Sequence, residues 1–217
     1  MASPGPLSQV FYARGSREVA RDLIGCRLVH RLPDGERLIL RLVEVEAYLG
    51  DGSDPASHAH RGPTPRNRAM FGPAGRLYAY RSYGIHTCVN VVCEAIGEAS
   101  AVLLRAGEPV QGAARMCTLR GLAVGADPRQ IASGPGRFAA ALGLSLENDG
   151  QSLLRGALTI WPLEPNAAPA CIATGPRVGI TKATDLPYRY FDAGSACVSP
   201  FRGGGRMRKP SGSGASR

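Results

Sequence analysis

The amino-acid sequence predicts a single α+β domain, in which a curved, barrel-like antiparallel β-sheet is surrounded by helices. Short strand patterns joined by tight turns dominate, and helical patterns are inserted among them without β-α-β alternation. No glycine-rich loop of the dinucleotide or P-loop type follows a strand, so no nucleotide cofactor is expected. With 217 residues, the chain is long enough for one domain with a core and too short for two large ones.

The first expected elements are a helix and a hairpin. Ser16 can cap a helix over 17–24, and Gly25 can end it. Strands over 26–32 and 37–47 follow, and the Pro-Asp-Gly sequence between them is typical of a tight turn. Alternation along the second strand predicts two opposite faces, with Leu42, Glu44 and Glu46 on one and Val43, Val45 and Ala47 on the other.

A long loop and a second hairpin are expected next. Residues 50–75 are rich in Gly, Pro, Ser and Asp, and a loop of this length in a compact domain is usually functional or disordered. Strand patterns over 77–81 and 85–93 flank a Tyr-Gly pair at 83–84, which can form a tight turn or a bulge. A further short strand is expected over 101–105.

The second half of the chain is expected to contain two helices and then short strands. Pro109 can open a helix that runs through Leu119, because proline is tolerated in a first turn. Residues 133–143 indicate a helix capped by Ser133 and stopped by a glycine. From 157 to 198, short apolar runs alternate with Gly and Pro, as short strands do.

The two ends set the expected domain boundaries. Residues 1–9 are expected to form a flexible arm, and the domain to span 10–201. The tail at 202–217 is rich in Gly and Ser and basic without an acid, so it is expected to be disordered. This tail supplies five of the nine net positive charges, so the overall charge is a weak argument for nucleic acid.

The charge pattern between Pro55 and Cys93 is a better indication of a polyanionic partner. The stretch contains no Asp or Glu, but it holds five arginines, three of the four histidines and three tyrosines. Arginines can bind phosphates and tyrosines can stack on bases. A carboxylate at the edge of this surface, such as Glu46, could act on the bound substrate.

Two interpretations of Glu46 remain open from its position. Glu44 and Glu46 could be solvated charges on an exposed strand face. However, Glu46 is followed by Ala-Tyr-Leu-Gly, which places it at a strand end beside a long loop, where catalytic groups often lie. A partly desolvated carboxylate with a raised pKa would suit a general base.

The tyrosines and histidines also allow more than one role. Tyr78 and Tyr80 share a strand face, and aromatic residues there belong more often to a core than to a binding surface. Tyr83, at the turn, would project outward and could wedge between base pairs. His58 and His60 could form a metal-binding pair, but no further ligand cluster accompanies them, so a pocket role is favoured and no metal site is expected.

One part of the long loop is suited to phosphate contacts. Thr64, Arg66, Asn67 and Arg68 offer hydroxyl, guanidinium and amide donors in a segment stiffened by proline. A solvated basic turn is the alternative interpretation.

Other features restrict the class of protein. The six cysteines form no Cys-x-x-Cys pair and are expected to be buried small side chains. No apolar run approaches the length that crosses a bilayer, and no secretory signal opens the chain, so a cytosolic protein without a membrane partner is expected.

Taken together, the chain resembles the alkyladenine DNA glycosylases, also called 3-methyladenine or methylpurine glycosylases, over roughly residues 10–200. The motifs that carry the resemblance are, in order, Val43-Glu-Val-Glu-Ala-Tyr-Leu-Gly50, Ser57-His58, Thr64-Pro-Arg-Asn-Arg-Ala-Met-Phe71, Leu77-Tyr-Ala-Tyr-Arg-Ser-Tyr-Gly84, Cys88-Val-Asn90, Val102-Leu-Leu-Arg-Ala106, Ser133-Gly-Pro-Gly136 and Arg177-Val-Gly-Ile180. Each motif is weak alone, but the ordered set is specific. His60 competes with His58 for the histidine position, and Arg137 stands where a lysine is common in relatives.

The resemblance implies roles for these residues. Glu46 would deprotonate water for attack on C1′ of a flipped nucleotide, and Arg105 would help to hold the water and the nucleotide. Tyr48, His58 and Tyr80 would line the base pocket. Asn90 would obstruct the 2-amino group of normal guanine, and Tyr83 would fill the gap left in the duplex.

The implied activity is that of a monofunctional glycosylase of base excision repair. It would flip alkylated or deaminated purines out of double-stranded DNA, hydrolyse the N-glycosidic bond and leave an abasic site, as a monomer and without a cofactor. Strand cleavage is not expected, because water is the nucleophile and lysine is scarce. Such a protein would be cytoplasmic and nucleoid-associated in a bacterium, and nuclear in a eukaryote.

Two alternatives compete with the enzyme. A non-catalytic protein that binds damaged DNA would keep the arginines and the wedge but would not need Glu46. A formyltransferase-like or other small-substrate domain would explain neither the acid-free stretch nor Tyr83.

Overall fold

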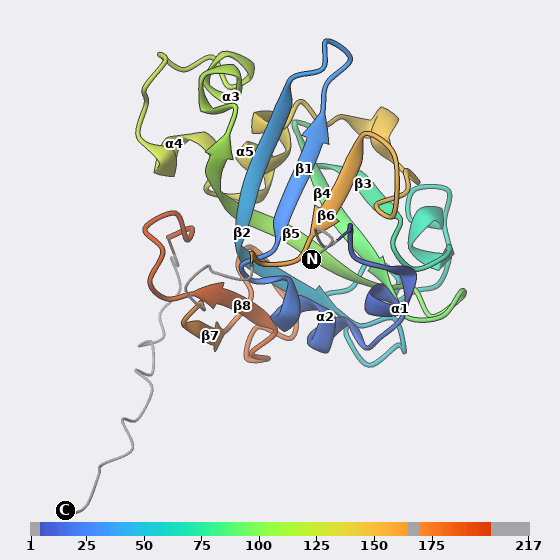
Figure 1. The fold of residues 1–217 in the computed structure, drawn as a ribbon. Coiled ribbons are helices and arrows are strands. Elements are labelled where there is room, and N and C mark those ends of the chain that lie inside the picture. The colour runs from blue at the N-terminus through green and yellow to red at the C-terminus, as the bar shows by residue number, and fades with distance from the viewer. Residues whose placement is uncertain (1–4, 165–169, 201–217) are drawn as a thin grey trace, which may run out of the picture.

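The computed structural model describes residues 5–164 and 170–200, and one antiparallel sheet dominates them, as the sequence predicts (Figure 1). The strands are β1 (Arg27–Arg31), β2 (Arg37–Tyr48), β3 (Leu77–Ser82), β4 (His86–Cys93), β5 (Ser100–Gln111), β6 (Leu158–Trp161), β7 (Ile172–Gly175) and β8 (Arg189–Asp192). The helices are α1 (Gln9–Tyr12), α2 (Ser16–Leu23), α3 (Ala113–Leu119), α4 (Pro128–Ala132) and α5 (Pro135–Ala141), with 3-10 turns η1 (Arg68–Phe71) and η2 (Leu146–Asn148). None of the described helices is long and apolar enough to span a membrane.

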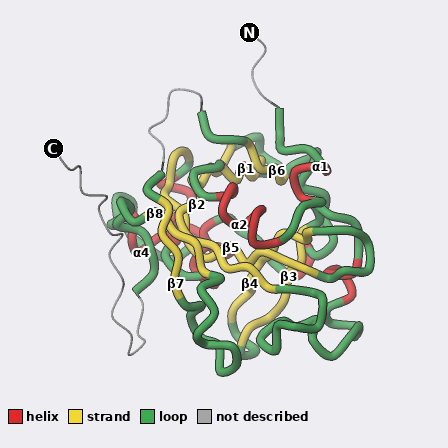
Figure 2. The backbone as a smooth tube through the Cα atoms, turned by 90° about the horizontal axis from the view of Figure 1, so that it is seen from below, coloured by secondary structure: helices red, strands yellow, loops and turns green. Residues whose placement is uncertain are grey.

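Strand β2 is the centre of the sheet. The strand order is β3-β4-β5-β2-β1-β6, and β8 pairs with both β2 and β7 (Figure 2). One edge of β2 pairs with β5, whereas the other edge pairs first with β1, up to Arg41, and then with β8, from Glu44 to Glu46. The change of partner coincides with register shifts between Leu42 and Val45. A bulge of this kind bends a strand and increases its twist, which allows β2 to serve two neighbours on one edge.

The predicted alternation along β2 is wrong at this bulge. Leu42 lies in the main core together with Val45, whereas Val43 packs with Ala106 and Cys197 in a separate cluster. An extra residue at a bulge inverts the side-chain alternation. Leu42 therefore does not share a face with Glu44, and the two glutamates lie on the side opposite to the core residue Val45.

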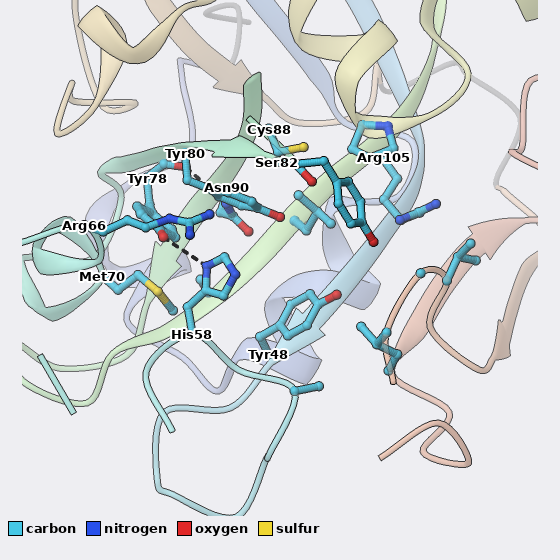
Figure 3. A pocket seen from close by; sticks show the side chains of 18 residues that line it. Tyr48, His58, Arg66, Met70, Tyr78, Tyr80, Ser82, Cys88, Asn90 and Arg105 are labelled. Carbon is cyan, nitrogen blue, oxygen red and sulfur yellow. Dashed lines mark hydrogen bonds between the residues drawn. The ribbon is translucent and has the colours of Figure 1, made fainter. Parts of the chain in front are cut away.

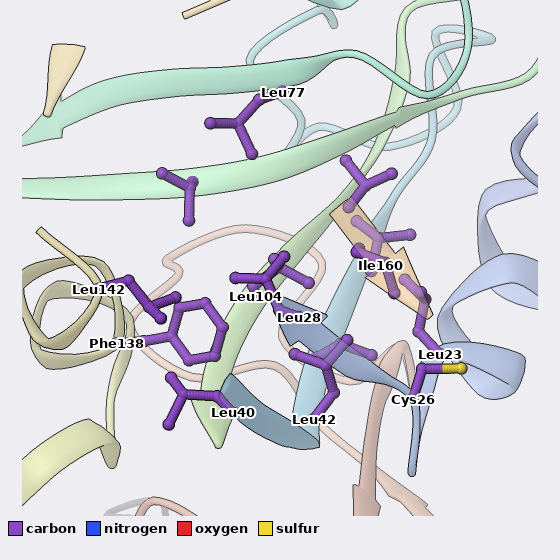
Figure 4. Packing of buried hydrophobic residues seen from close by; sticks show 14 of the residues in the cluster. Leu23, Cys26, Leu28, Leu40, Leu42, Leu77, Leu104, Phe138, Leu142 and Ile160 are labelled. Carbon is purple, nitrogen blue, oxygen red and sulfur yellow. The ribbon is translucent and has the colours of Figure 1, made fainter. Parts of the chain in front are cut away.

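The main core lies on one face of the sheet, against α2 and α5 (Figure 4). It joins Leu23 of α2 to Phe138 of α5 and to Leu142 at the end of that helix, with Leu28, Leu40, Leu104 and Ile160 from the strands. The opposite face carries a smaller cluster, in which Tyr78 of β3 meets Met70 and Ala59 of the long loop. Alternation along β3, β4 and β5 thus divides their side chains between the core and the face that holds the candidate site.

The predicted helix caps are wrong, although both glycine stops are confirmed. Ser16 lies inside α2, and its backbone N–H donates to a carboxylate oxygen of Glu94 at 2.9 Å. Ser133 pairs with Ala106 of β5, so the position before α5 is taken by Gly134. In both cases a tertiary contact replaces the local cap. Gly25 and Gly143, with φ of 90° and 67°, end their helices as predicted.

Pro109 does not open a helix. It lies in β5 opposite Leu40, and the helix begins only at Ala113, after Gly112 with φ of 79°. The register between β2 and β5 shifts at Ile39 and Leu40, so the ladder is already irregular where proline lacks its N–H. Helix α4 was not predicted.

The remaining expectations meet the structure in part. The long loop is irregular apart from η1, and residues 83–84 form a turn rather than a bulge, with φ of 50° and 71°. The short strands expected after residue 157 are β6, β7 and β8. Leu7 donates its N–H to Ile160, while residues 1–4 of the arm and the tail at 202–217 lie outside the described residues. Five cysteines are buried as expected, and Cys171 is exposed.

A prediction concerns Gly50, which follows β2. A Cβ atom built there would lie 1.5 Å from the carbonyl oxygen of Glu98, so the backbone would have to move. We expect Gly50→Ala to lower the free energy of unfolding by about 3 kcal/mol, measured by urea denaturation. Gly175→Ala is the control, because its Cβ would meet Phe191 at an ordinary 3.7 Å. Equal stability of the two variants would refute this account.

Candidate active site

A cavity of about 420 Å³ opens on the face of the sheet opposite the main core (Figure 3). Its size is within the range of small-molecule sites, roughly 300–1,000 Å³. Strands β2 to β5, the long loop and the segment before β8 all contribute to its wall. The lining residues are Tyr48, Ala56, His58, Arg66, Met70, Tyr78, Tyr80, Ser82, Tyr83, Cys88, Asn90, Ala101, Leu103, Arg105, Pro135, Val178, Gly179 and Ile180.

Glu46 lies fully buried behind this wall, and each of its hydrogen-bond partners lines the cavity. One carboxylate oxygen accepts the Tyr48 hydroxyl at 2.9 Å and lies 3.4 Å from an Arg105 nitrogen, while the other accepts the N–H of Val178 at 2.7 Å. Burial raises the pKa of Glu46 above its usual value, although Arg105 and the two hydrogen bonds oppose the shift. Because the Glu46 side chain is fully buried, it is not a solvated charge on an exposed strand face.

Glu44 is equally buried but is held as an anion. It accepts hydrogen bonds from Arg189 at 2.7 Å and from Arg105 at 3.1 Å, and Ser199 donates to it through both its N–H and its hydroxyl. Burial pushes the pKa of Glu44 upward, but the two guanidinium charges and the Ser199 bonds outweigh it and lower the pKa. Two carboxylates on one strand thus have pKa values displaced in opposite directions.

Arg105 connects the two carboxylates. It lies where the β2–β5 register shifts, and its guanidinium reaches Glu44 and Glu46 through different nitrogens. The contacts are 3.1 Å to Glu44 and 3.4 Å to Glu46, so the positive charge of Arg105 is shared between the two carboxylates. The outcome is a positive group beside a carboxylate that it does not fully neutralise.

An aromatic group forms another part of the wall. Tyr78 and Tyr80, two residues apart on β3, stack with centroids 5.5 Å apart, and His58 meets the Tyr80 ring edge-on at 4.6 Å. The Tyr78 hydroxyl lies 3.0 Å from Nδ1 of His58, as the dashed line in Figure 3 marks. Tyr78 was not predicted as a site residue, although its period-two spacing from Tyr80 was the available signal. Tyr78 belongs both to a binding surface and to a core, since it lines the cavity and packs in the smaller cluster.

The structure distinguishes the two histidines of the loop. Both residues retain solvent exposure, but His58 lines the cavity and contacts the Tyr78 hydroxyl, whereas His60 does not line it and contacts the carbonyl of Gly52. Burial, followed by the positive charge of Arg66, lowers the pKa of His58 below its ordinary 6.5. Its imidazole is therefore neutral at neutral pH.

Asn90 and Tyr83 both line the cavity but differ in their exposure to solvent. Asn90 is buried on β4, and its amide donates to the carbonyl of Tyr78 at 3.1 Å. Tyr83 is 86% exposed on the β3–β4 turn, yet it also contributes to the cavity wall. An aromatic side chain held at the rim by a tight turn is consistent with the outward projection that the sequence predicts.

The loop residues expected to contact phosphates have different surroundings. Thr64, Arg66 and Arg68 are exposed, and the Arg66 guanidinium lies over the Tyr80 ring at 5.5 Å. Asn67 is buried. Its amide oxygen accepts a hydrogen bond from Thr64, and its amide nitrogen donates to the carbonyls of His58 and Gly62. Its amide is thus committed to holding the loop that carries His58, and does not face solvent as a phosphate contact requires.

Several residues behind the cavity were not predicted from the sequence. Arg189 and Ser199 hold Glu44, and Arg177 forms a buried ion pair with Asp54. A partner more than 100 residues away gives no local signal. Within the described residues, no group of three or more His, Cys, Asp or Glu side chains is arranged to hold a metal ion.

Comparison with known proteins is consistent with this geometry. The profile of the methylpurine-DNA glycosylase family matches residues 10–196. The chain belongs to the methylpurine-DNA glycosylase family. It is 50% identical to a protein of Methanoculleus marisnigri over 195 residues, covering 89% of this chain and 98% of the relative. A Nitrobacter winogradskyi relative is 47% identical, with 92% and 90% covered, and one from Rhodopseudomonas palustris is 49% identical, with 86% and 84% covered. All three relatives carry 3-methyladenine DNA glycosylase as a provisional name.

Family membership identifies the chain as a DNA glycosylase, a hydrolase of N-glycosidic bonds that acts in the repair of alkylated DNA. Within a methylpurine-DNA glycosylase, the cavity with Glu46 behind its wall is the candidate active site. The DNA substrate also explains why acids are absent between Pro55 and Cys93, in the segment that supplies much of the wall.

A prediction concerns the protonation of His58. Arg66→Ala removes one of the two causes that lower the pKa of His58, so the pKa should rise toward 6.5. An NMR titration of the imidazole measures the change. Arg68→Ala is the control, because Arg68 lies on the same loop but is not among the groups that shift His58. Titration of wild-type His58 above pH 6.5 would contradict the prediction.

A second prediction concerns Glu44 and acid. Because its folded pKa is lowered, Glu44 contributes stability that is present above its unfolded pKa and is lost as the pH falls through the folded pKa. Glu44→Gln leaves Arg105 and Arg189 short of a buried partner and should cost about 3 kcal/mol at pH 7. In urea denaturation, the difference from wild type should shrink below pH 4.5, the usual value. A difference independent of pH would show that charge is not the cause.

Proposed function

We propose that the protein is a monomeric, monofunctional glycosylase that flips alkylated or deaminated purines out of duplex DNA. It hydrolyses the N-glycosidic bond with water activated by Glu46 and leaves an abasic site. The supporting observation is a carboxylate with a raised pKa that lies directly behind an aromatic cavity, bonded to three residues of the cavity wall.

The cavity suits a flipped, electron-poor base. Tyr48, Tyr80 and His58 supply aromatic surface, and a cationic alkylated purine stacked on an electron-rich ring gains about 1–2 kcal/mol per favourable contact. Because His58 is neutral, it does not repel such a base. Asn90, a buried residue of the cavity wall, would reject the 2-amino group of normal guanine by occupying its space.

Glu46 and Arg105 carry the chemical step in this proposal. Departure of the base leaves an oxocarbenium-like sugar, which the Glu46 carboxylate stabilises while taking a proton from water. Arg105, held by Glu44, orients the water and the nucleotide without fully neutralising Glu46. A base of this kind must be ionised, so the rate should rise with pH through the raised pKa of Glu46.

The residues at the rim of the cavity would contact the DNA duplex. Extrusion of a nucleotide costs a few kcal/mol, least where pairing is already damaged. Tyr83, exposed on a turn at the rim, would occupy the gap left in the stack, and Thr64, Arg66 and Arg68 would contact phosphates.

A prediction tests the role of Glu46 as the general base. With a labelled duplex carrying one hypoxanthine or ethenoadenine, we expect wild type to yield strand breaks only after hot alkali, since water as the nucleophile leaves the strand intact. Glu46→Gln should bind the duplex but release base at least about 1,000-fold more slowly. Glu147→Gln, an exposed change on η2, is the control.

Other outcomes would count against the proposal. Breaks without alkali would contradict monofunctional hydrolysis. Binding without base release, from these substrates and from DNA carrying 3-methyladenine or 7-methylguanine, would favour a protein that only binds damaged DNA. Activity retained in Glu46→Gln would assign the base to another residue.

A further inference from the structure

A buried ion pair behind the cavity joins three segments that form its wall. Arg177 binds Asp54 in a bidentate manner, with nitrogen–oxygen distances of 2.6 and 2.8 Å, and neither side chain is exposed. Arg177 also donates to the carbonyl of Ala47 at 3.0 Å. The pair therefore ties the end of β2, the long loop and the segment before β8 to one another.

Each side of this ion pair continues into a group of the active site. Asp54 accepts the N–H groups of Leu49 and Ala56, and so sets the path of the loop between Tyr48 and His58. On the other side, the residue directly after Arg177 is Val178, whose N–H donates to Glu46 at 2.7 Å. A shift of the Arg177 backbone would therefore move a hydrogen bond to the proposed base.

Arg177 also supports Tyr48. Its guanidinium lies over the Tyr48 ring at 4.6 Å and over the Tyr188 ring at 5.3 Å. Since Arg177 is buried and does not line the cavity, it contacts Tyr48 from behind the wall. Tyr48 in turn donates its hydroxyl to Glu46. Arg177 is therefore connected to Glu46 both through Val178 and through Tyr48.

We propose that the Arg177–Asp54 ion pair is a positioning element of the active site, which fixes Val178 and Tyr48 against Glu46. This inference rests on the proposed role of Glu46 as the base. The ion pair does not touch the substrate in this account. Its effect is on the geometry and ionisation of the carboxylate, and it should appear in the chemical step more than in DNA binding.

The test compares two pairs of substitutions. Arg177→Gln alone would leave Asp54 charged and buried, which can unfold the protein. The double variant Asp54→Asn/Arg177→Gln removes both charges and keeps polar side chains in place. Arg41→Gln/Asp192→Asn is the matched control, because it removes a partly buried ion pair of 2.9 Å that contacts no residue of the cavity wall.

Three quantities are measured on the three proteins. They are the thermal midpoint of unfolding, the affinity for a duplex with a tetrahydrofuran abasic-site analogue, and the single-turnover rate of hypoxanthine release across pH. A misplaced catalytic group costs about 100-fold in rate, so a loss of that size is expected in the Asp54/Arg177 variant, with affinity little changed. The Val178 bond holds the pKa of Glu46 down, so its loss should also move the acid limb of the rate profile to higher pH.

The outcomes separate the inference from the proposed function. A slower variant with a shifted acid limb, beside a control with neither, supports the positioning role. A rate within a few fold of wild type overturns it, as does a slow rate with an unmoved limb in a variant destabilised no more than the control. Wild type that releases no base from any substrate would instead remove the proposed function itself.

Discussion

The burial of four charged side chains around one bend in β2 determines how the site is built. Glu44, Glu46, Arg105 and Arg189 lie almost fully out of water, and buried charges persist only where they are paired and hydrogen-bonded. Their pairing requires β5 and β8 to meet β2 on opposite edges, at the place where β2 changes partner. The bulge, the strand order and the position of Ser199 all serve this requirement, and the cavity forms in front of it.

Two neighbouring carboxylates have different properties because of their partners. Glu44 has two arginines and Ser199, and remains ionised as a fixed part of the framework. Glu46 shares one arginine with Glu44 and has two neutral donors, so desolvation prevails. Had Arg105 lain closer to Glu46 than to Glu44, the pKa of Glu46 would fall and its basicity with it. Desolvation, opposed by only one shared guanidinium, therefore sets the reactivity proposed for the site.

The sequence predicted what depends on short range. Strand periods, glycine stops and the ordered motifs identified the sheet, the family and the residues around the cavity, because each signal spans a few residues. Errors arose where distant segments decide the local structure. Glu94 takes the place of the Ser16 cap, β2 retains Pro109 in a strand, and the bulge changes the face of Leu42. Asn67 and Arg177 illustrate the same limit, since their roles follow from partners that only the fold brings near.

The order of the segments around Glu46 also has a consequence for how the protein matures. Val178 and Ser199 are 132 and 155 residues away from the carboxylates they bind. Closing such long loops is slow and entropically costly, and these contacts reward the chain only once the intervening sheet exists. During synthesis, β1 to β5 can pair while the acidic pair on β2 still lacks its final partners. The protein should therefore acquire a competent site late, as the last strand docks, because until then Arg105 is the only one of the two arginines that can pair with the buried glutamates.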